Sequence, residues 1–250
     1  MVFSFPLVEL SGAKIPRVLV GTSPFIAAGQ FGLKSYEYYY RFILKPENIV
    51  KILEHCFKLG VTGVQLLAYS FLAKAVEEAS RKAGIKPTVV ATLMPDEEES
   101  LDWIIKLDVA VALVHASIVD TLDLEKIYSQ IDLLKSCGLK YGLVTHEPWK
   151  TVPFIREHRI SEILMAPVNK HGIFMGDRDK VIALYRETGL NIIGKKVLGA
   201  GMIPVKEALE YVFGLDFIKS VAIGIASIRE AEETFSTAYS ILERLRGEKT

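Results

Sequence analysis

Eight short apolar runs alternate with amphipathic stretches along this 250-residue chain. The apolar runs cover residues 18–22, 63–67, 88–93, 109–114, 141–145, 162–166, 191–198 and 220–224. Apolar residues at helical spacing follow them at residues 45–59, 73–83, 124–136, 148–158, 178–188, 205–213 and 228–246, and an acidic helix start is predicted at 96–99. Strand–helix alternation with short connections predicts a parallel sheet covered on both faces. Eight such units in this length predict an α/β fold, a single (β/α)8 TIM barrel domain spanning residues 1–250.

Two segments lie outside this repeating pattern. Residues 1–17 contain a turn signal at Ser11-Gly12 and predict an N-terminal β-hairpin that caps the bottom of the barrel. Residues 23–44 separate the first strand from its helix and hold seven aromatic residues. A connection this long is usually functional in a barrel, so we predict an aromatic loop over the barrel mouth. A substrate lid, a subunit contact and plain packing over the rim remain open as its role.

Composition narrows the class of function. Half of the residues are hydrophobic and the formal net charge is zero, which argues against a nucleic-acid partner. The sequence contains no run of 18 apolar residues, so no membrane span is predicted. The first residues lack the basic region and the cleavage site of a signal peptide. Both observations predict a cytoplasmic protein. Cys56 and Cys137 are predicted to be buried, reduced thiols. The scarcity of Asn and Gln indicates a thermophilic source.

Histidines gather where the predicted strands end. In a (β/α)8 enzyme the reacting groups lie at the carboxyl ends of the strands. Three of the five histidines, His115, His146 and His171, fall at or just after such ends, and Glu147 follows the second of them. A single histidine is more often a structural residue, but three at one rim predict that at least one faces a ligand.

Three chemistries fit these strand ends. The histidines with Glu147 could hold a divalent metal ion, because imidazole and carboxylate suit zinc or manganese. Lys195 or Lys196 could form a Schiff base if burial lowers its pKa, and strand alternation predicts that only one of them faces inward. A tyrosine acid and a histidine could polarise a carbonyl group for hydride transfer.

Several segments have the order and spacing of one enzyme family. Residues 60–69 read Gly-Val-Thr-Gly-Val-Gln-Leu-Leu-Ala-Tyr, and His115 ends the fourth predicted strand. Residues 20–23, 195–201 and 223–227 match the first, seventh and eighth strand ends. Together they resemble the aldo-keto reductase superfamily, whose second-strand motif is Gly-[VI]-[TN]-x-[FI]-Asp-[TS]-Ala-x-x-Tyr. No Gly-x-Gly-x-x-Gly follows the first strand, which argues against an open dinucleotide-binding sheet.

The resemblance implies a catalytic tetrad that this chain keeps only in part. The family uses a tyrosine acid, a lysine that lowers its pKa, an aspartate paired with that lysine, and a histidine that orients the carbonyl. His115 matches the histidine, and Tyr69 is the candidate tyrosine, one residue nearer the strand than in the family. Gln65 stands at the aspartate position, and Thr92 or Leu93 at the lysine position. Without a nearby ammonium group, we expect Tyr69 to be a poor proton donor at neutral pH.

NADP(H) is the cofactor that the resemblance implies. The candidate contacts are Gly199, Gly201, Gly224, Ser227 and Arg229. Glycines allow close approach of the backbone, and the serine and arginine could bind a phosphate group. The serine also fits a simpler role as the N-cap of the last helix, because a glutamate follows three residues later.

Three functions follow from these patterns. The first is an aldo-keto reductase-like oxidoreductase that uses NAD(P)H on a small carbonyl compound. In it, His115 and Tyr69 would act on the substrate beside Gln65. His146 and Glu147 would replace the lost acid–base pair. The second is a metal-dependent or Schiff-base lyase or isomerase, and the third is a non-catalytic binding protein. For all three functions we expect a small-molecule ligand and neither a nucleic-acid nor a membrane partner. All three are compatible with a homo-oligomer.

Overall fold

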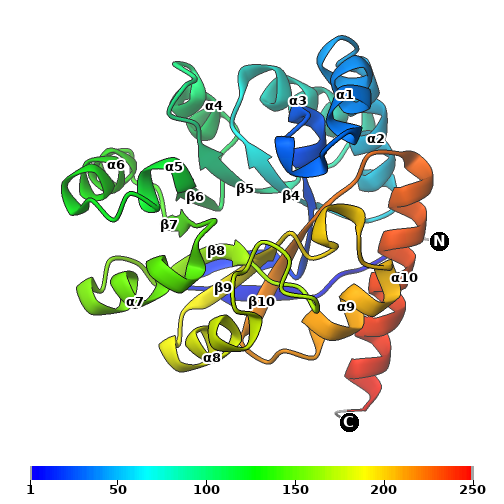
Figure 1. Cartoon of the computed structure of the whole chain (residues 1–250). Helices are drawn as coiled ribbons and strands as arrows, with labels where there is room; N and C mark the ends of the chain where they lie inside the picture. Colours follow the sequence, from blue (N-terminus) through cyan, green and yellow to red (C-terminus); the bar gives the residue numbers. More distant parts are fainter. Residues whose placement is uncertain (1, 249–250) are drawn as a thin grey trace.

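The computed structural model describes residues 2–248 and contains eight parallel strands closed into a barrel (Figure 1). In the order in which they pair, the strands are β3 (Val18–Gly21), β4 (Gly63–Leu67), β5 (Thr88–Leu93), β6 (Val111–Val114), β7 (Tyr141–Val144), β8 (Ile163–Pro167), β9 (Asn191–Lys195) and β10 (Ile218–Gly224). β10 pairs with β3 in parallel and closes the ring. The predicted (β/α)8 TIM barrel is confirmed.

Helices cover the outside of the barrel (Figure 1). They are α1 (Lys34–Tyr38), α2 (Glu47–Lys58), α3 (Ser70–Ala83), α4 (Ser100–Lys106), α5 (Ala116–Val119), α6 (Leu124–Ser136), α7 (Pro148–His158), α8 (Arg178–Thr188), α9 (Val205–Phe213) and α10 (Ile228–Gly247). Asp123, Asp177 and Ser227 cap α6, α8 and α10 by accepting a backbone N–H three residues on. Gly84 and Gly189 end α3 and α8 in the left-handed conformation.

The N-terminal hairpin fills the bottom of the barrel. β1 (Leu7–Leu10) and β2 (Ala13–Pro16) pair antiparallel, as predicted. Leu10, Ala13 and Ile15 are buried against side chains inside the barrel. Ser11 in the turn donates to Glu162 at 2.7 Å, just before β8. The hairpin therefore closes the amino ends of the strands and leaves the carboxyl ends open.

Residues 23–44 fold as consecutive short helical turns. The ring centroids of Phe25 and Phe42 lie 5.0 Å apart, and those of Phe31 and Tyr38 lie 5.2 Å apart, both edge to face. Three further tyrosines of this segment are exposed: Tyr36, Tyr39 and Tyr40. These ring pairs lie within the segment and hold its helical turns together by contacts that aromatic pairs favour.

Several predicted boundaries are wrong; among them, the helix predicted from residue 73 begins at Ser70 and the strand predicted from residue 109 begins at Val111. The seventh strand ends at Lys195, not at residue 198, because Lys196 has a φ of 55° and leaves the extended conformation. Residues 96–99 do not begin a helix, and α4 starts at Ser100. The hydroxyl group of Ser70 donates to the carboxylates of Glu97 and Glu99 at 2.7 and 2.8 Å, so these side chains brace the turn against α3.

The two cysteines differ in their surroundings. Cys56 is buried on α2, and burial raises the pKa of its thiol to about 12. Cys137 is exposed after α6, so the prediction of two buried thiols is wrong for this residue. Within residues 2–248, no helix is long and apolar enough to cross a membrane.

Candidate active site

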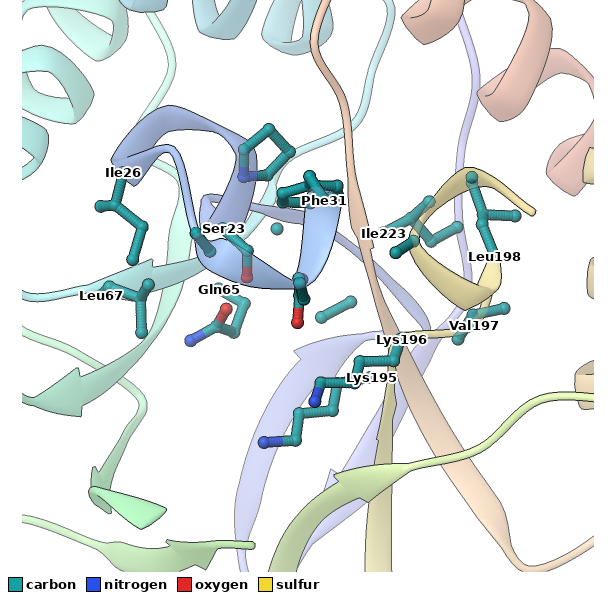
Figure 2. A pocket seen from close by; sticks show the side chains of 18 of the residues that line it. Ser23, Ile26, Phe31, Gln65, Leu67, Lys195, Lys196, Val197, Leu198 and Ile223 are labelled. Carbon is teal, nitrogen blue, oxygen red and sulfur yellow. The ribbon is translucent and has the colours of Figure 1, made fainter. Parts of the chain in front are cut away.

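A cavity of ≈ 1080 Å³ opens at the carboxyl ends of the barrel strands. Its inner part is lined by strand-end residues, among them Gly21, Gln65, Leu67, Thr92, His115, Val144, His146, Met165, Lys195 and Ala222. Its outer part lies between the aromatic segment 23–44, the loop after β9 and the start of α10. Figure 2 shows Lys195 and Lys196 extending from the β9 end toward the side of the cavity that carries Gln65.

Gln65 and Thr92, the residues predicted to stand at the aspartate and lysine positions of the implied tetrad, are joined by a neutral hydrogen bond. Gln65 and Thr92 are 2% and 1% exposed, and the Gln65 Nε2 donates to Thr92 Oγ1 at 3.2 Å. The same amide group donates to the carbonyl oxygen of Leu66 at 3.3 Å. An amide and a hydroxyl can satisfy each other in a buried site, whereas a lone carboxylate or ammonium there would remain unpaired. Gln65 and Thr92 therefore form a buried pair that carries no charge.

Tyr69 is held by a carboxylate rather than by a lysine. Its hydroxyl group donates to Asp96 Oδ2 at 3.1 Å. Burial, followed by the charge of Asp96 and this hydrogen bond, raises the pKa of Tyr69 to about 12. A phenol with this pKa, already donating its proton to a carboxylate, is a weak acid toward a substrate.

Lys195 is the buried amine of the cavity. It is 7% exposed, and its Nζ lies 3.0 Å from His146 Nδ1. Burial, followed by repulsion from Lys196, holds the pKa of Lys195 well below its usual value, while Asp120 acts in the opposite direction. Desolvation disfavours the charged form of a lysine, so the amine gains nucleophilic character.

His146 faces the cavity from the end of β7 and is neutral at physiological pH. Burial, then Lys195, Lys196 and His115, lower the pKa of His146 to about 3. His146 is exposed toward the cavity that it lines, and the charges that act on its imidazole are those of Lys195 and Lys196. A neutral imidazole 3.0 Å from an amine can accept or return a proton.

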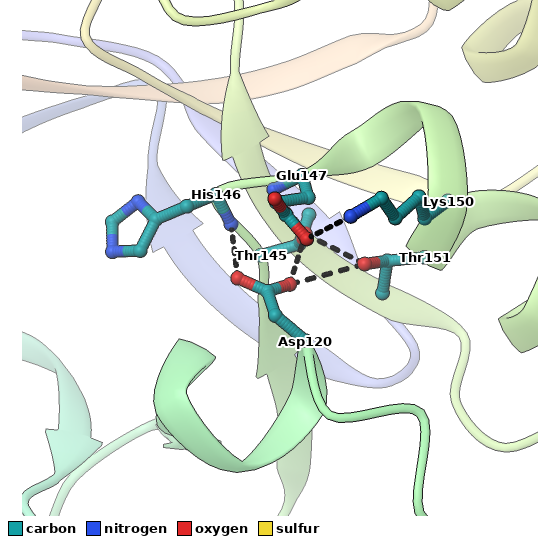
Figure 3. Close-up of polar contacts among 6 residues, drawn as sticks. All are labelled: Asp120, Thr145, His146, Glu147, Lys150 and Thr151. Atoms are coloured by element: carbon teal, nitrogen blue, oxygen red, sulfur yellow. Dashed lines mark hydrogen bonds and ion pairs between the residues drawn. The ribbon is translucent and has the colours of Figure 1, made fainter.

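Asp120, which follows α5, fixes the backbone of His146 (Figure 3). Its Oδ2 accepts the His146 N–H at 2.9 Å. Its Oδ1 accepts the hydroxyl groups of Thr145 at 2.5 Å and Thr151 at 3.0 Å. The carboxylate thus joins the loop after β6 to β7 and α7. The sequence patterns did not single out this residue, because a lone acid in a βα loop carries no motif.

His115 lines the cavity and also caps α5. Its Nδ1 accepts the backbone N–H of Ser117 at 3.1 Å and lies 2.8 Å from the hydroxyl oxygen of that serine. Burial and the charge of Lys195 lower the pKa of His115. Two of the three predicted rim histidines, His115 and His146, therefore share one cavity with Lys195.

The adjacent lysines do not alternate between two faces. Lys196 also lines the cavity, because its left-handed backbone breaks the strand pattern. The prediction that only one of the two lysines faces inward is wrong. The Nζ of Lys196 lies 4.4 Å from the ring centroid of Phe174, and burial lowers the pKa of Lys196.

Other predicted site residues lie outside the cavity lining. Glu147 pairs with Lys150 at 2.9 Å. His171 lies 3.1 Å from Glu207 and is not among the residues that line the cavity. Within residues 2–248, no group of three or more His, Cys, Asp or Glu side chains is placed to hold a metal ion. The metal-dependent alternative therefore lacks a ligand set in this part of the chain.

Only some of the residues predicted to contact a nucleotide cofactor are free to do so in the cavity. Gly201 and Gly224 line the cavity. A Cβ at Gly199 would meet Ile173 at 2.8 Å, so that glycine serves packing. Arg229 is exposed and does not line the cavity.

Ser227 has the capping role, because its Oγ accepts the Glu230 N–H at 3.0 Å. The Glu230 carboxylate in turn accepts the N–H of Ala226 at 2.9 Å, which completes a capping box. Glu230 and Glu233 face the outer cavity, where Lys34 is the neighbouring cation in the lining. Two carboxylates suit the 2′-phosphate of NADP(H) poorly, because like charges repel.

Comparisons with known proteins identify the fold. No protein-family model and no curated protein sequence matches the chain. A Pseudomonas aeruginosa protein provisionally described as an aldo-keto reductase is similar, with 20% identity, a TM-score of 0.68, and 95% of this chain and 94% of that chain covered. A deep-sea metagenome aldo-keto reductase has 11% identity and a TM-score of 0.62, covering 94% of each chain. The glycerol dehydrogenase of Gluconobacter oxydans has 12% identity and a TM-score of 0.59, covering 95% of each. The chain has the fold of the aldo-keto reductases, at 11–20% sequence identity to these three structures.

Proposed function

We propose that this protein is an enzyme acting on a small carbonyl compound, and that Lys195 is its nucleophile. One observation carries the proposal: a 7% exposed lysine lies at the end of β9, faces the cavity, and has its Nζ 3.0 Å from a histidine nitrogen. A desolvated lysine next to another cation is the usual form of an amine that makes Schiff bases. The lyase or isomerase class fits this site better than the standard reductase tetrad.

The proposed step begins with the neutral amine of Lys195. The nitrogen lone pair attacks the carbonyl carbon, and a C–N bond forms as the C=O π bond breaks. The oxygen takes one proton from the amine and a second from solvent, and the remaining C–O bond breaks to release water. The resulting iminium withdraws electrons from the neighbouring C–H or C–C bond, so that bond can break heterolytically. His146, with its Nδ1 3.0 Å from the lysine nitrogen, relays the amine proton to the departing oxygen in a concerted transfer, because a pKa of about 3 prevents a stable imidazolium. His115 lines the same cavity and supplies a second neutral imidazole next to the substrate.

Reductive trapping tests the proposed nucleophile. The protein is incubated with hydroxyacetone and sodium cyanoborohydride, and the modified peptide is identified by mass spectrometry. We expect saturable labelling of Lys195, and its loss in Lys195→Met. Lys34→Met, a change to another lysine in the cavity lining, is the matched control and should leave labelling unchanged. Labelling spread evenly over surface lysines, with none at Lys195, would rule out the proposal.

A second candidate is NAD(P)H-dependent reduction of a carbonyl compound. The likeness in fold to aldo-keto reductases over 95% of the chain favours it. Against it stand the neutral Gln65–Thr92 pair and the weakly acidic Tyr69, and the two glutamates at the outer cavity weigh against NADPH in particular. Titration of NADH and NADPH by fluorescence separates the candidates. Saturable binding accompanied by carbonyl reduction would favour the reductase, whereas neither binding nor trapping would leave a non-catalytic binding protein.

A further inference from the structure

The inner cavity holds two lysine side chains that no acid of the described chain pairs with directly. Lys195 and Lys196 both line it, and neither has an ion-pair partner among residues 2–248. Asp120 acts electrostatically on both lysines, but its oxygens already accept three hydrogen bonds. Asp96 is engaged by Tyr69. With Lys195 acting as the neutral nucleophile, a ligand is the group left to pair with the ammonium group of Lys196.

The backbone at Lys196 is held in an unusual conformation. Its φ of 55° lies in the left-handed region, which is unfavourable for a non-glycine residue. The carbonyl oxygen of Lys196 accepts the N–H of Gly199 at 2.8 Å and the side-chain amide of Asn169 at 3.3 Å, which hold this conformation. The turn places two consecutive lysines in one cavity, which a continuous strand would prevent. Backbone strain retained in this way is typical of ligand sites.

The chemistry of this site selects the class of substrate. We infer that Lys196 binds a carboxylate on the substrate, so that the carbonyl compound attacked by Lys195 is a short oxo acid. A single flexible ammonium suits a monoanion, whereas a phosphate dianion usually meets several donors or a helix N-terminus. Val144, Met165 and Ala222 line the inner cavity and fit a short aliphatic chain. This inference rests on the proposed function and adds the anionic group to it.

Two nearly isosteric probes test the inference. Pyruvate and pyruvamide have the same methyl ketone, and only pyruvate carries a negative charge. With cyanoborohydride, we expect Lys195 to be labelled at a pyruvate concentration about tenfold below that needed for pyruvamide, a difference of about 1.4 kcal/mol. Lys196→Met should remove this difference by weakening pyruvate alone, and Lys196→Arg should restore part of it. Lys34→Met controls for loss of any cavity lysine.

The outcomes separate the two proposals. Equal labelling of Lys195 by both probes, or a preference for pyruvate that survives in Lys196→Met, would overturn the oxo-acid inference and leave the nucleophile in place. Absence of label at Lys195 with either probe would overturn the proposed function itself and this inference with it. Circular dichroism of each variant distinguishes a lost contact from a failure to fold.

Discussion

Asp120→Asn tests the network that holds His146 next to Lys195. The carboxylate accepts the His146 N–H at 2.9 Å and two threonine hydroxyl groups at 2.5 and 3.0 Å. A hydrogen bond to a charged group contributes about 1.5–3 kcal/mol to stability. An amide keeps one accepting oxygen and presents an NH₂ group to the remaining donors. We therefore expect the free energy of unfolding to fall by about 3 kcal/mol, from one lost charge-assisted bond and two weakened ones.

Urea unfolding followed by circular dichroism measures this loss. Asp123→Asn is the matched control, since Asp123 caps α6 by accepting the Lys126 N–H at 3.2 Å. Asparagine caps helices about as well as aspartate, so the control should change stability by less than about 0.5 kcal/mol. An Asp120→Asn variant as stable as the control would refute the assignment of Asp120 as the link between these elements.

The same variant has a second, functional readout. Asp120 raises the pKa of Lys195, opposing the effect of burial. Removing its charge should lower the pKa of Lys195 further and leave more of the amine neutral at a given pH. The pH dependence of pyruvate labelling should therefore move to lower pH in Asp120→Asn. A shift to higher pH would contradict the electrostatic account even if the stability loss agreed with it.

Three further predictions concern stability and are measured by denaturant unfolding. Thr92→Val removes the acceptor of the Gln65 amide and should lower the free energy of unfolding by about 1–3 kcal/mol. Adding Gln65→Leu should recover part of that loss, because no polar partner is then left without its hydrogen bond. Losses that simply add in the double variant would contradict a direct hydrogen bond. Gly60→Ala should cost more than about 1 kcal/mol, because Gly60 has a φ of 91° and a Cβ would collide with the carbonyl group of Phe3; wild-type stability would disprove this. Between the lowered pKa of folded Lys195 and its unfolded pKa of about 10.4, the unfolded chain binds a proton that the folded chain does not, so the free energy of unfolding rises with pH. Lys195→Met should make this rise smaller. An unchanged slope of the free energy of unfolding against pH would exclude burial of the amine.

The barrel could be predicted because its sequence signals are local. Each strand is a short apolar run, and helix ends carry their own chemistry, such as the caps at Asp123 and Ser227. The errors arose where tertiary contacts decide the backbone. Ser70 binds the acidic side chains after β5 and prevents an early helix, and packing around Lys196 ends β9 three residues before its apolar pattern ends.

The site could be predicted only in part. Strand ends identified Lys195, His115 and His146 as candidates, because barrel topology brings all such ends together. The partner of each side chain was not predictable. Asp120 reaches His146 across 26 residues of sequence, and Tyr69 bonds Asp96 rather than a lysine. These pairings depend on loop geometry that no periodicity encodes.

The hairpin that fills the base of the barrel has a kinetic consequence. Leu10, Ala13 and Ile15 are buried there among the inward-facing side chains of the strands, so the cavity is reached from the mouth beneath residues 23–44. Any molecule that enters by this passage must return through it. In the proposed reaction, product and incoming substrate then compete for the same vacant form of the protein, and we expect product to act as a competitive inhibitor.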